Sequence, residues 1–495
     1  MDRYLFTVNF RADGSSKFIK SNQWGYFPSG AFAWRLIQEP FMKGLKGVVN
    51  DAKIRISTGT VGNNRGVNDF SYLLELGQIE KKRAYTFDGN TLTNGLTQYF
   101  YSNPNLTWEK TTEYNIGTDW SLFDDRFTLT ADYYRRITSD FLMAKNIPYY
   151  AGYFNGSNTR YENVGNVLNQ GIELTLGATL VKSKNLTWSV NINSSYNTNK
   201  ILEIAQGNDV LVQGGPDNII PLWVAKKGSS ISQFYGFMSD GLYQYDDFYS
   251  NPNGTYTLKP EVVNFKTLKN ANFPVQPGDR KYKDFNGDNV IDDNDRTTLG
   301  SPIPFLTGGV TTNVTWKGFS VQAFFQYSYG NKVLNYNALK FGESGKFWNR
   351  GNMYASFANR WTPENTNTDI PRILESTGGG DVSVATPRIT DKFVEDGSFI
   401  RFKTLSVSYT VSKKVLQKIK LSNLMFVFSA QNIALWSKYS GQDPEVSNYG
   451  GVNQKRGTGY TELTNTTSYS SMTGGMDNAA YPRSLTLNGG INITF

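Results

Sequence analysis

The chain contains neither cysteine nor histidine. Without cysteine it cannot form a disulfide framework or a thiolate metal site. Without histidine it lacks the commonest general base, the Ser-His-Asp triad and imidazole-bound zinc. Hydrolysis by paired carboxylates remains as a catalytic route. Over 495 residues, these absences favour binding or transport over enzymatic activity.

Long hydrophobic runs are also absent, since no run of about 18 apolar residues occurs, and this excludes a transmembrane helix. The mean hydropathy is −0.45. A membrane β-barrel is compatible with this low value, because its strands alternate apolar and polar residues. Aromatic residues are abundant, at 15% of the chain. That content fits both the aromatic girdles of a membrane barrel and a carbohydrate-binding β-protein.

The net charge of +8 has two interpretations. One is a polyanionic partner, and the other is a set of lysines scattered over polar faces and turns. The densest basic runs are only Lys413-Lys414 and Lys81-Lys82-Arg83, so the sequence favours scattered lysines. We expect no nucleic-acid partner.

The chain opens on Tyr4-Leu-Phe-Thr-Val-Asn-Phe10, which has the pattern of a strand. A secreted protein begins instead with a basic and then an apolar leader. Either a leader has been removed or the sequence starts inside a longer protein, and a start within a strand favours the second.

The dominant periodicity is two residues, as in β-strands, and not the 3.6 residues of a helix. In the segment 127–133, Leu129 and Ala131 take one face, whereas Thr128 and Thr130 take the other. Three further segments repeat the pattern, with an exception at Phe324: 172–180, 186–193 and 319–327. The polar positions are mostly Thr, Ser, Asn and Gln, so we expect water on one face and lipid on the other.

The alternating runs measure roughly 9–12 residues, which suits a tilted strand that crosses the hydrocarbon layer. We expect about fourteen strands in an antiparallel transmembrane sheet and little helix. They lie near 2–13, 23–38, 51–61, 71–79, 108–122, 125–143, 167–182, 185–201, 229–240, 305–317, 318–330, 398–412, 421–435 and 483–495.

Short and long connections alternate along the chain. Short turns lie at 123–126, 182–185 and 316–319, and a longer one with a possible helical turn lies near 412–421. The long connections cover roughly 62–108, 143–166, 200–305, 331–397 and 434–481. Short turns on one rim and long loops on the other are typical of outer-membrane barrels. The last strand also ends in an aromatic residue, Phe495, as barrel strands recognised during membrane assembly do.

Several segments together resemble one family, the SusC/RagA type of TonB-linked outer-membrane transporter. They are Arg11–Phe18, Trp24–Ser29, Ala33–Arg35, Arg55–Asn63, Asp284–Arg296, Leu299–Pro304, Arg360–Asn365, Asp396–Lys403, Ser429–Ile433 and Asp443–Glu445. They occur in family order and cover nearly the whole chain.

The resemblance implies an all-β fold, a barrel of about 22 strands closed by an N-terminal plug. Residues 1–495 would supply the C-terminal part of that barrel, and the plug and early strands would lie outside the sequence. It also implies a SusD-like surface lipoprotein as a lid, and import of oligosaccharides or peptides driven by the TonB complex through the outer membrane of a Gram-negative bacterium. No cofactor is implied.

One acidic segment has the spacing of a calcium loop. Its candidate oxygen ligands are Asp284, Asn286, Asp288, Val290 through its backbone carbonyl, Asp292 and Asp295. Asn289 stands where such loops carry Gly, and Asp295 stands where they carry Glu. A calcium ion would hold an external loop in a structural role. The alternative is a solvated acidic turn held by Asx hydrogen bonds.

Two loops are rich in aromatic side chains that can stack on sugars or contact peptides. They contain Tyr149, Tyr150, Tyr153 and Phe154 in one case, and Phe234, Tyr235, Phe237, Tyr243 and Tyr245 in the other. Girdle anchoring and contact with a lid are the alternatives, so no substrate-contacting residue is assigned. The acid pairs Asp124-Asp125 and Asp292-Asp293 lie in turn-like sequence, so no catalytic residue is assigned either.

The sequence thus predicts nutrient import through the outer membrane. Two other functions stay open, namely a passive porin-like channel and a soluble carbohydrate-binding β-protein.

Overall fold

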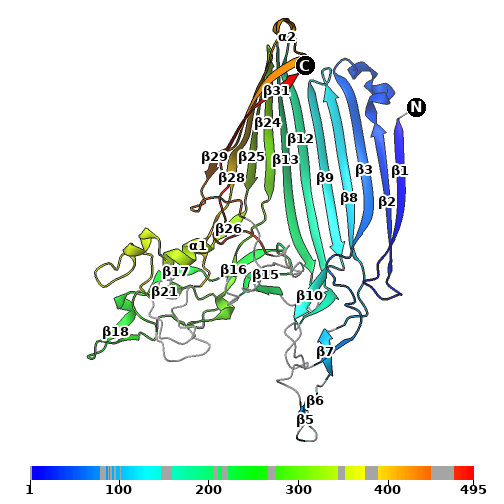
Figure 1. Cartoon of the computed structure of the whole chain (residues 1–495). Helices are drawn as coiled ribbons and strands as arrows, with labels where there is room; N and C mark the ends of the chain where they lie inside the picture. Colours follow the sequence, from blue (N-terminus) through cyan, green and yellow to red (C-terminus); the bar gives the residue numbers. More distant parts are fainter. Residues whose placement is uncertain are drawn as a thin grey trace.

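The computed structural model describes residues 3–78, 85–86, 89, 92–93, 96–100, 102–146, 159–204, 210–213, 221–265, 275–343, 352–373, 388–446 and 473–495. One antiparallel sheet of twelve strands dominates them (Figure 1). Its strands lie side by side in chain order: β1 (Tyr4–Gly14), β2 (Trp24–Arg35), β3 (Val49–Asn63), β8 (Glu109–Leu122), β9 (Phe127–Ser139), β12 (Asn166–Lys182), β13 (Leu186–Glu203), β24 (Leu306–Trp316), β25 (Phe319–Tyr329), β28 (Phe399–Thr410), β29 (Asn423–Ser437) and β31 (Thr486–Thr494).

Two of the strands expected from the sequence do not join this sheet. Within 71–78, the described part of the expected strand 71–79, only β4 (Glu75–Gln78) forms, and it pairs with β7 (Leu96–Phe100) in a separate ribbon. The region 229–240 splits into β16 (Gln233–Gly236) and β17 (Ser239–Leu242), which pair within the loops. Both runs are too short to cross a membrane, which takes about 9–11 residues. In the second, Phe234 and Phe237 are both buried three positions apart, so the period of two is lost.

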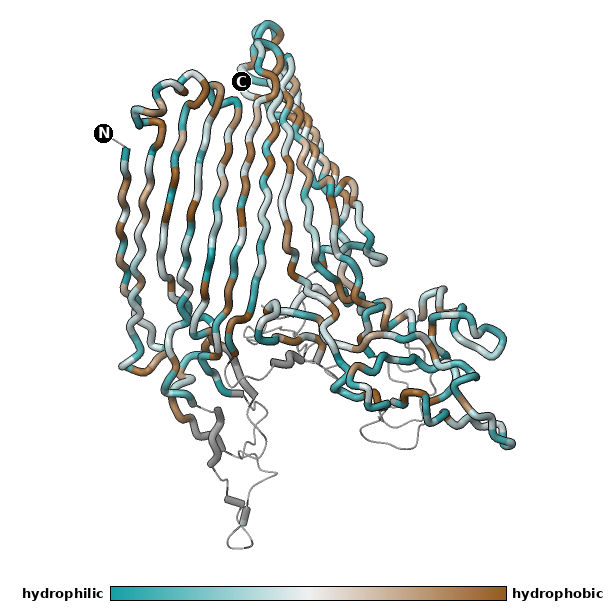
Figure 2. Tube along the Cα trace, turned by 180° about the vertical axis from the view of Figure 1, so that it is seen from behind, coloured by the Kyte–Doolittle hydropathy of each residue, from teal (hydrophilic) through white to brown (hydrophobic). Residues whose placement is uncertain are grey.

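The register of the sheet separates apolar from polar side chains. Residues directly opposite each other on antiparallel strands share a face. One row across nine strands is apolar or aromatic throughout: Phe6, Phe32, Ile56, Ile116, Tyr133, Ile172, Tyr196, Leu306 and Tyr329. The adjacent row, on the other face, is polar apart from one glycine from β3 to β25, whereas it holds Leu5 and Ala33 on β1 and β2: Arg55, Gly117, Asp132, Glu173, Ser195, Thr307 and Ser328. Figure 2 shows the resulting alternation of hydrophobic and hydrophilic positions along the strands.

The apolar face of the sheet is open. Phe6 is 76% exposed and Ile172 is 53% exposed. A soluble β-sandwich would cover such a face with a second sheet, yet no second layer covers it within the residues that the structure describes. Leu129 lies on this face opposite Trp120 and Leu176, as the sequence predicted.

The other face carries polar side chains. Thr130 lies on it, as predicted, and its hydroxyl donates a hydrogen bond to Asp119. Phe324, the exception in the alternating pattern, also lies on this face, opposite Thr311. Gly309 leaves room for its ring, because a Cβ at Gly309 would come within 2.5 Å of the Phe324 side chain.

The connections of the large sheet are short at one end and long at the other. The short ones, at the top of Figure 1, are 36–48, 123–126, 183–185, 317–318 and 411–422. The last contains helix α2 (Lys413–Ile419), which confirms the predicted helical turn. The long connections at the opposite end include 64–108, 140–165, 204–305, 330–398 and 438–485.

The long connections carry the smaller elements. The remaining strands are β5 (Tyr85–Thr86), β6 (Leu92–Thr93), β10 (Leu142–Asn146), β11 (Thr159–Asn163), β14 (Val210–Gln213), β15 (Pro221–Ala225), β18 (Phe248–Ser250), β19 (Tyr256–Leu258), β20 (Asn264–Phe265), β21 (Arg280–Tyr282), β22 (Val290–Ile291), β23 (Thr297–Gly300), β26 (Lys332–Asn335), β27 (Val394–Asp396) and β30 (Met476–Asp477). The long connections also contain the helical turns η6 (Tyr245–Asp247), η7 (Asp293–Asp295), α1 (Tyr336–Ala338), η8 (Leu339–Glu343), η10 (Ala355–Asn359) and η11 (Asp391–Phe393). The short connection 36–48 contains η1 (Leu36–Gln38) and η2 (Pro40–Leu45). None of the helices in the described ranges is long and apolar enough to span a membrane.

A hydrophobic core joins four of the long connections to one another. Val164, Trp223, Leu334 and Met476 belong to it, and each comes from a different connection. Trp223 is fully buried, and its indole N–H donates to the carbonyl of Gly474. The loops therefore form a packed layer at one end of the sheet, and this layer positions the polar groups described below.

Candidate functional site

The polar face of the sheet carries an ion-pair network on β3, β8 and β9. Arg55 contacts two carboxylates, with 2.8 Å from its Nε to Asp119 and 3.1 Å from its Nη2 to Asp132. Lys53 lies 2.9 Å from the same Asp119. These side chains keep between 15% and 32% of their surface exposed, so the network borders open space. This face suits contact with water and polar solutes.

A second charged cluster is buried where β28 and β29 meet the loop layer. The Arg401 side chain is only 4% exposed, and its Nη2 lies 2.6 Å from Asp443. Its Nε lies 3.1 Å from Glu445, which also pairs with Arg483 at 3.3 Å. Two of the segments that carry the family resemblance, 396–403 and 443–445, therefore meet in one ion cluster.

This cluster continues onto the polar face of the sheet. The Lys403 ammonium donates a 2.6 Å hydrogen bond to Gln326, whose amide lies 3.5 Å from the Glu445 carboxylate. A cavity of about 260 Å³ adjoins these groups, and its lining includes Gln326, Ser328, Asn331 and Glu445. Amide, hydroxyl and carboxylate groups thus face one space at the loop end of the sheet.

A larger cavity of about 500 Å³ lies within the loop layer. Its lining includes Asn335, Glu343, Tyr354, Lys392 and Gln442. Glu343 pairs with Lys392 at 3.3 Å. The lining of this cavity combines hydrogen-bond donors, acceptors and an aromatic ring, and it suits hydrogen bonding to sugar hydroxyls or peptide amides.

Buried charges hold the wall of the larger cavity. Arg280 is 7% exposed and lies 2.5 Å from Glu343 and 2.9 Å from Asp369. Burial raises the pKa of Asp369, but hydrogen bonds from Lys392 and Arg280 outweigh it, so the pKa lies below its usual value. Asp369 is therefore held as a carboxylate beside the cavity.

The aromatic loop residues have structural roles where the structure describes them. Phe234, Phe237 and Tyr243 are at most 2% exposed and belong to the hydrophobic cores, so they do not offer rings to a substrate. Tyr245 packs against Tyr256 and Trp361 with tilted rings, whose centroids lie 5.3 and 5.4 Å away. The aromatic residues of the other loop, Tyr149, Tyr150, Tyr153 and Phe154, lie outside the described residues.

The acid pairs lie in turns and loops of the described residues. Asp124 and Asp125 lie in the exposed turn between β8 and β9, at the end of the sheet opposite the cavities. Asp292 and Asp293 lie in the acidic loop, where Asp292 caps the short helix η7.

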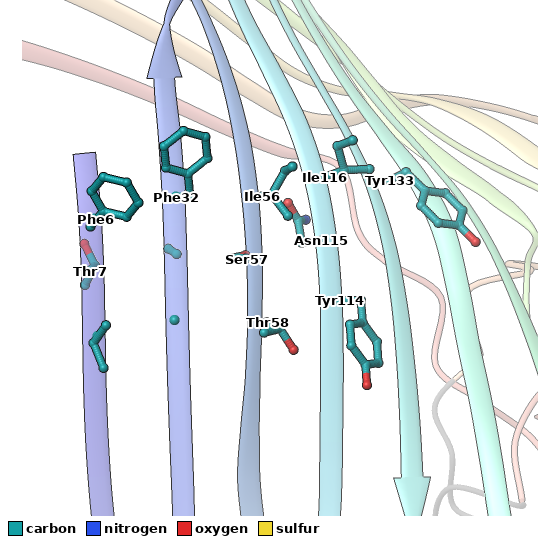
Figure 3. Close-up of a pocket in the computed structure, with 13 residues that line it drawn as sticks. Phe6, Thr7, Phe32, Ile56, Ser57, Thr58, Tyr114, Asn115, Ile116 and Tyr133 are labelled. Atoms are coloured by element: carbon teal, nitrogen blue, oxygen red, sulfur yellow. The ribbon is translucent and has the colours of Figure 1, made fainter. Parts of the chain in front are cut away.

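The apolar face carries a hollow of about 530 Å³, lined by residues of β1, β2, β3, β8 and β9 (Figure 3). Phe6, Phe32, Ile56 and Tyr114 surround it, and Gly30 leaves the space between them. The hollow is shallow and lies on the face that carries the apolar rows. It suits an apolar chain and not a polar substrate.

The acidic loop folds around its own backbone. The two carboxylate oxygens of Asp284 accept hydrogen bonds from the N–H groups of Gly287 and Asn289, at 2.7 and 2.8 Å. Asp295 is fully buried and accepts from the N–H groups of Phe285 and Asp292, which ties the start of the loop to its end.

Two backbone and charge features of this loop bear on metal binding. Asn289 has a φ of 62°, the left-handed conformation that the sixth position of a calcium loop takes. Burial raises the pKa of Asp284, but backbone hydrogen bonds from Gly287 and Asn289 help to bring it below its usual value. Within the described ranges, however, no three Asp or Glu side chains converge as for a metal ion. The arrangement agrees with the Asx turns that the sequence allowed as the alternative.

Arg401 and Gln326 were not predicted as site residues from the sequence. The available signal was the opposite charge of the segments 396–403 and 443–445, but nothing in the sequence shows that these two segments touch. Gln326 lies in strand β25, and the alternation of that strand predicts only which face of the sheet the side chain occupies.

Comparison with known proteins gives three findings. A family model described as TonB dependent receptor-like, beta-barrel, matches residues 1–272. TonB-dependent receptor P3 of Formosa agariphila is 32% identical over this whole chain, which covers 44% of that protein. TonB-dependent receptor SusC of Bacteroides thetaiotaomicron is 28% identical, and this chain covers 42% of it.

A solved structure of the RagAB peptide importer in the 'closed-closed' state has the same fold. It matches all of this chain with a TM-score of 0.73 at 21% identity, and the match covers 46% of that chain. The 'open-open' state gives a TM-score of 0.72. The chain spans just under half the length of the relatives that it matches.

The buried Arg401 cluster generates a stability prediction. Arg401→Gln should destabilise the loop end of the protein by about 3–5 kcal/mol, because it leaves the buried Asp443 without its cation and leaves Glu445 with the exposed Arg483 only. Thermal unfolding of the purified protein measures the loss. As a matched control, Arg136→Gln removes an exposed pair with Glu113 and should cost about 1 kcal/mol or less. Equal effects of the two substitutions would contradict the structural role of the cluster.

Proposed function

The chain belongs to the family of TonB-dependent receptor-like β-barrels, and from this we propose that it forms part of the wall of an outer-membrane transporter for oligosaccharides or peptides. One observation carries the proposal, which is the twelve-stranded sheet with one open apolar face and one polar face. Its strands run from 9 to 18 residues, long enough to cross the hydrocarbon layer. The polar face would line the channel.

Polar groups at the long-loop end support a substrate with many hydrogen-bonding groups. Both polar cavities lie there, and their linings combine carboxylates with Asn, Gln and Ser. Sugars and peptides share this hydrogen-bonding chemistry. The RagAB protein of similar fold is a peptide importer, which supports peptides as one of the two substrate classes.

The proposal includes two partners. A SusD-like surface lipoprotein would act as a lid, and the TonB complex would supply the energy. The family resemblance supports both. Exposed apolar and aromatic side chains at the long-loop end also support a protein partner there. They include Phe70, Tyr249, Phe285, Tyr354 and Tyr481. The barrel would lie in the outer membrane of a Gram-negative bacterium, with the long loops outside the cell.

The two alternative functions differ from this proposal in measurable ways. A passive porin would need no energy for uptake. A soluble carbohydrate-binding protein would not expose an apolar face as large as the one seen here.

Uptake by cells tests the proposal. Cells of the native host are grown with a mixture of oligosaccharides and peptides, and mass spectrometry measures the depletion of each class from the medium. We expect deletion of the gene to abolish the depletion of one of the two classes. Addition of a protonophore to cells that carry the gene should stop the same depletion, because TonB-linked import depends on the proton gradient. An affinity-tagged protein from these cells should retain a lipoprotein during purification.

The controls separate the alternatives. Re-expression of the gene should restore depletion in the deletion strain. Depletion that continues after the gradient has collapsed would support a passive channel and contradict active import. Recovery of the protein in the soluble fraction, without detergent, would contradict both membrane functions.

A structural calcium ion in the acidic loop is a separate part of the proposal. Its ligands would be Asp284, Asn286, Asp288, the Val290 carbonyl, Asp292 and Asp295. The spacing, the left-handed Asn289 and the lowered pKa of Asp284 support it. The ion would add to the hydrogen bonds that already tie the loop. It would have no part in chemistry, and no other cofactor is proposed.

Calcium titration tests this assignment. We expect millimolar Ca²⁺ to raise the unfolding temperature, with a gain of about 2.7 kcal/mol when Ca²⁺ is at 100 times its dissociation constant. Asp288→Asn with Asp292→Asn should remove the response and keep the turn, because the amide oxygen still accepts the backbone N–H groups. Asp240→Asn with Asp246→Asn, outside the loop, is the matched control. A response equal in all three proteins, or no response in the wild type, would rule out the site.

A further inference from the structure

The positive charge of the chain is concentrated at the short-connection end of the sheet. The segments 36–48, 123–126, 182–185, 317–318 and 411–422 are called the short-turn rim below. The rim holds ten Lys or Arg residues and three Asp or Glu residues, a net charge of +7. The whole chain carries +8. The other 40 Lys and Arg residues lie outside the rim, where 39 Asp and Glu residues nearly balance them. The basic residues are thus scattered, as the sequence suggested, but the fold brings ten of them to one end, because every second connection of the sheet returns to the same rim.

Several lysines of this rim lack acidic partners in the part of the chain that the structure describes. Helix α2 and the residue after it supply four of them, Lys413, Lys414, Lys418 and Lys420, all of them exposed. Neither these four nor Lys43 of η2 lies in an ion pair within the described residues. The positive charge of the rim is therefore available to an external anion.

Apolar side chains are exposed among these lysines. Val415 and Ile419 lie one helical turn apart on α2, and each is 47% exposed. The helix is fixed from its other side, because Leu416 is only 5% exposed. On η2, Phe41 is 64% exposed and Leu45 is 49% exposed. Lysines beside exposed apolar residues at the end of a membrane segment are typical of groups that lie in the lipid headgroup region.

We propose that the short-turn rim binds anionic phospholipid headgroups, with α2 lying in the membrane interface. Val415 and Ile419 would enter the edge of the hydrocarbon, and the four lysines would contact lipid phosphates. The short turns of outer-membrane barrels face the periplasm, so the lipids would be phospholipids of the inner leaflet. Turns that only faced water would carry the lysines without the exposed apolar residues.

This inference rests on the proposed membrane location and adds a lipid preference to it. The probes are spin-labelled phosphatidylglycerol and spin-labelled phosphatidylcholine in bilayers that contain the reconstituted protein. Electron paramagnetic resonance then measures two quantities. The motionally restricted fraction reports contact between lipid and protein, and the ratio of the two association constants reports selectivity for the anionic headgroup.

In the wild type, phosphatidylglycerol should associate about two- to fivefold more strongly than phosphatidylcholine, and added salt should reduce this ratio. The α2 variant, with Lys413→Gln, Lys414→Gln, Lys418→Gln and Lys420→Gln, should lose most of the preference. A matched control changes four exposed lysines of the long-loop end to Gln and should keep it: Lys20, Lys227, Lys283 and Lys438. Inorganic phosphate at millimolar concentration should not displace the lipid, because it lacks the chains that enter the interface.

The two readouts separate the possible failures. One outcome in the wild type is a restricted fraction with equal association constants for phosphatidylglycerol and phosphatidylcholine. That result would overturn the lipid preference and leave the membrane location intact. An α2 variant that keeps the full preference would also overturn it. The absence of any restricted fraction would instead contradict the proposed membrane function itself.

Discussion

Pairing of the backbone in one continuous antiparallel ladder is the constraint on which the rest of this structure depends. In hydrocarbon no water is present to satisfy N–H and C=O groups, so each spanning strand needs neighbours along its length. Among the described residues, the strands of the large sheet from β2 to β29 have such a neighbour on each side, β1 and β31 have one neighbour each, and no crossover occurs. Once the backbone is satisfied in this way, the side chains of one face are free to be apolar and exposed.

The polar face and the loop layer follow from the same constraint. Every side chain that does not point to the apolar face points to the opposite one, which explains how Arg55, Asp119 and Asp132 come together from three strands.

At the long-loop end, chain segments far apart in sequence are held by a shared core and by buried ion pairs such as Arg401 with Asp443. Burying such charges is costly unless they are paired, so these contacts fix a specific arrangement of loops around the polar cavities. At the opposite end the lysines of α2 have no such pairing among the described residues, and that end carries nearly all of the net charge.

The large sheet was predictable because its signals are local. Alternation assigns each strand residue to a face without knowledge of its neighbours, so Leu129, Thr130 and even the exception Phe324 were placed correctly. Strand order was also accessible, since consecutive strands pair. The errors fell where local patterns are short, as in 71–79 and 229–240. The buried positions of Phe234, Phe237 and Tyr243 depend on contacts among separate loops, and no local pattern encodes these contacts. The charge of the short-turn rim was hidden for a similar reason, because its lysines are dispersed in sequence and meet only in the fold.

The central claim is that the apolar face meets lipid and the polar face meets water. The most direct test compares Leu129→Arg with Thr130→Arg, two neighbouring residues on opposite faces, by the free energy of folding into lipid bilayers. The account predicts a loss of about 2–4 kcal/mol for Leu129→Arg, if residue 129 lies near the middle of the bilayer, and a much smaller loss for Thr130→Arg. Equal losses at the two positions would contradict it.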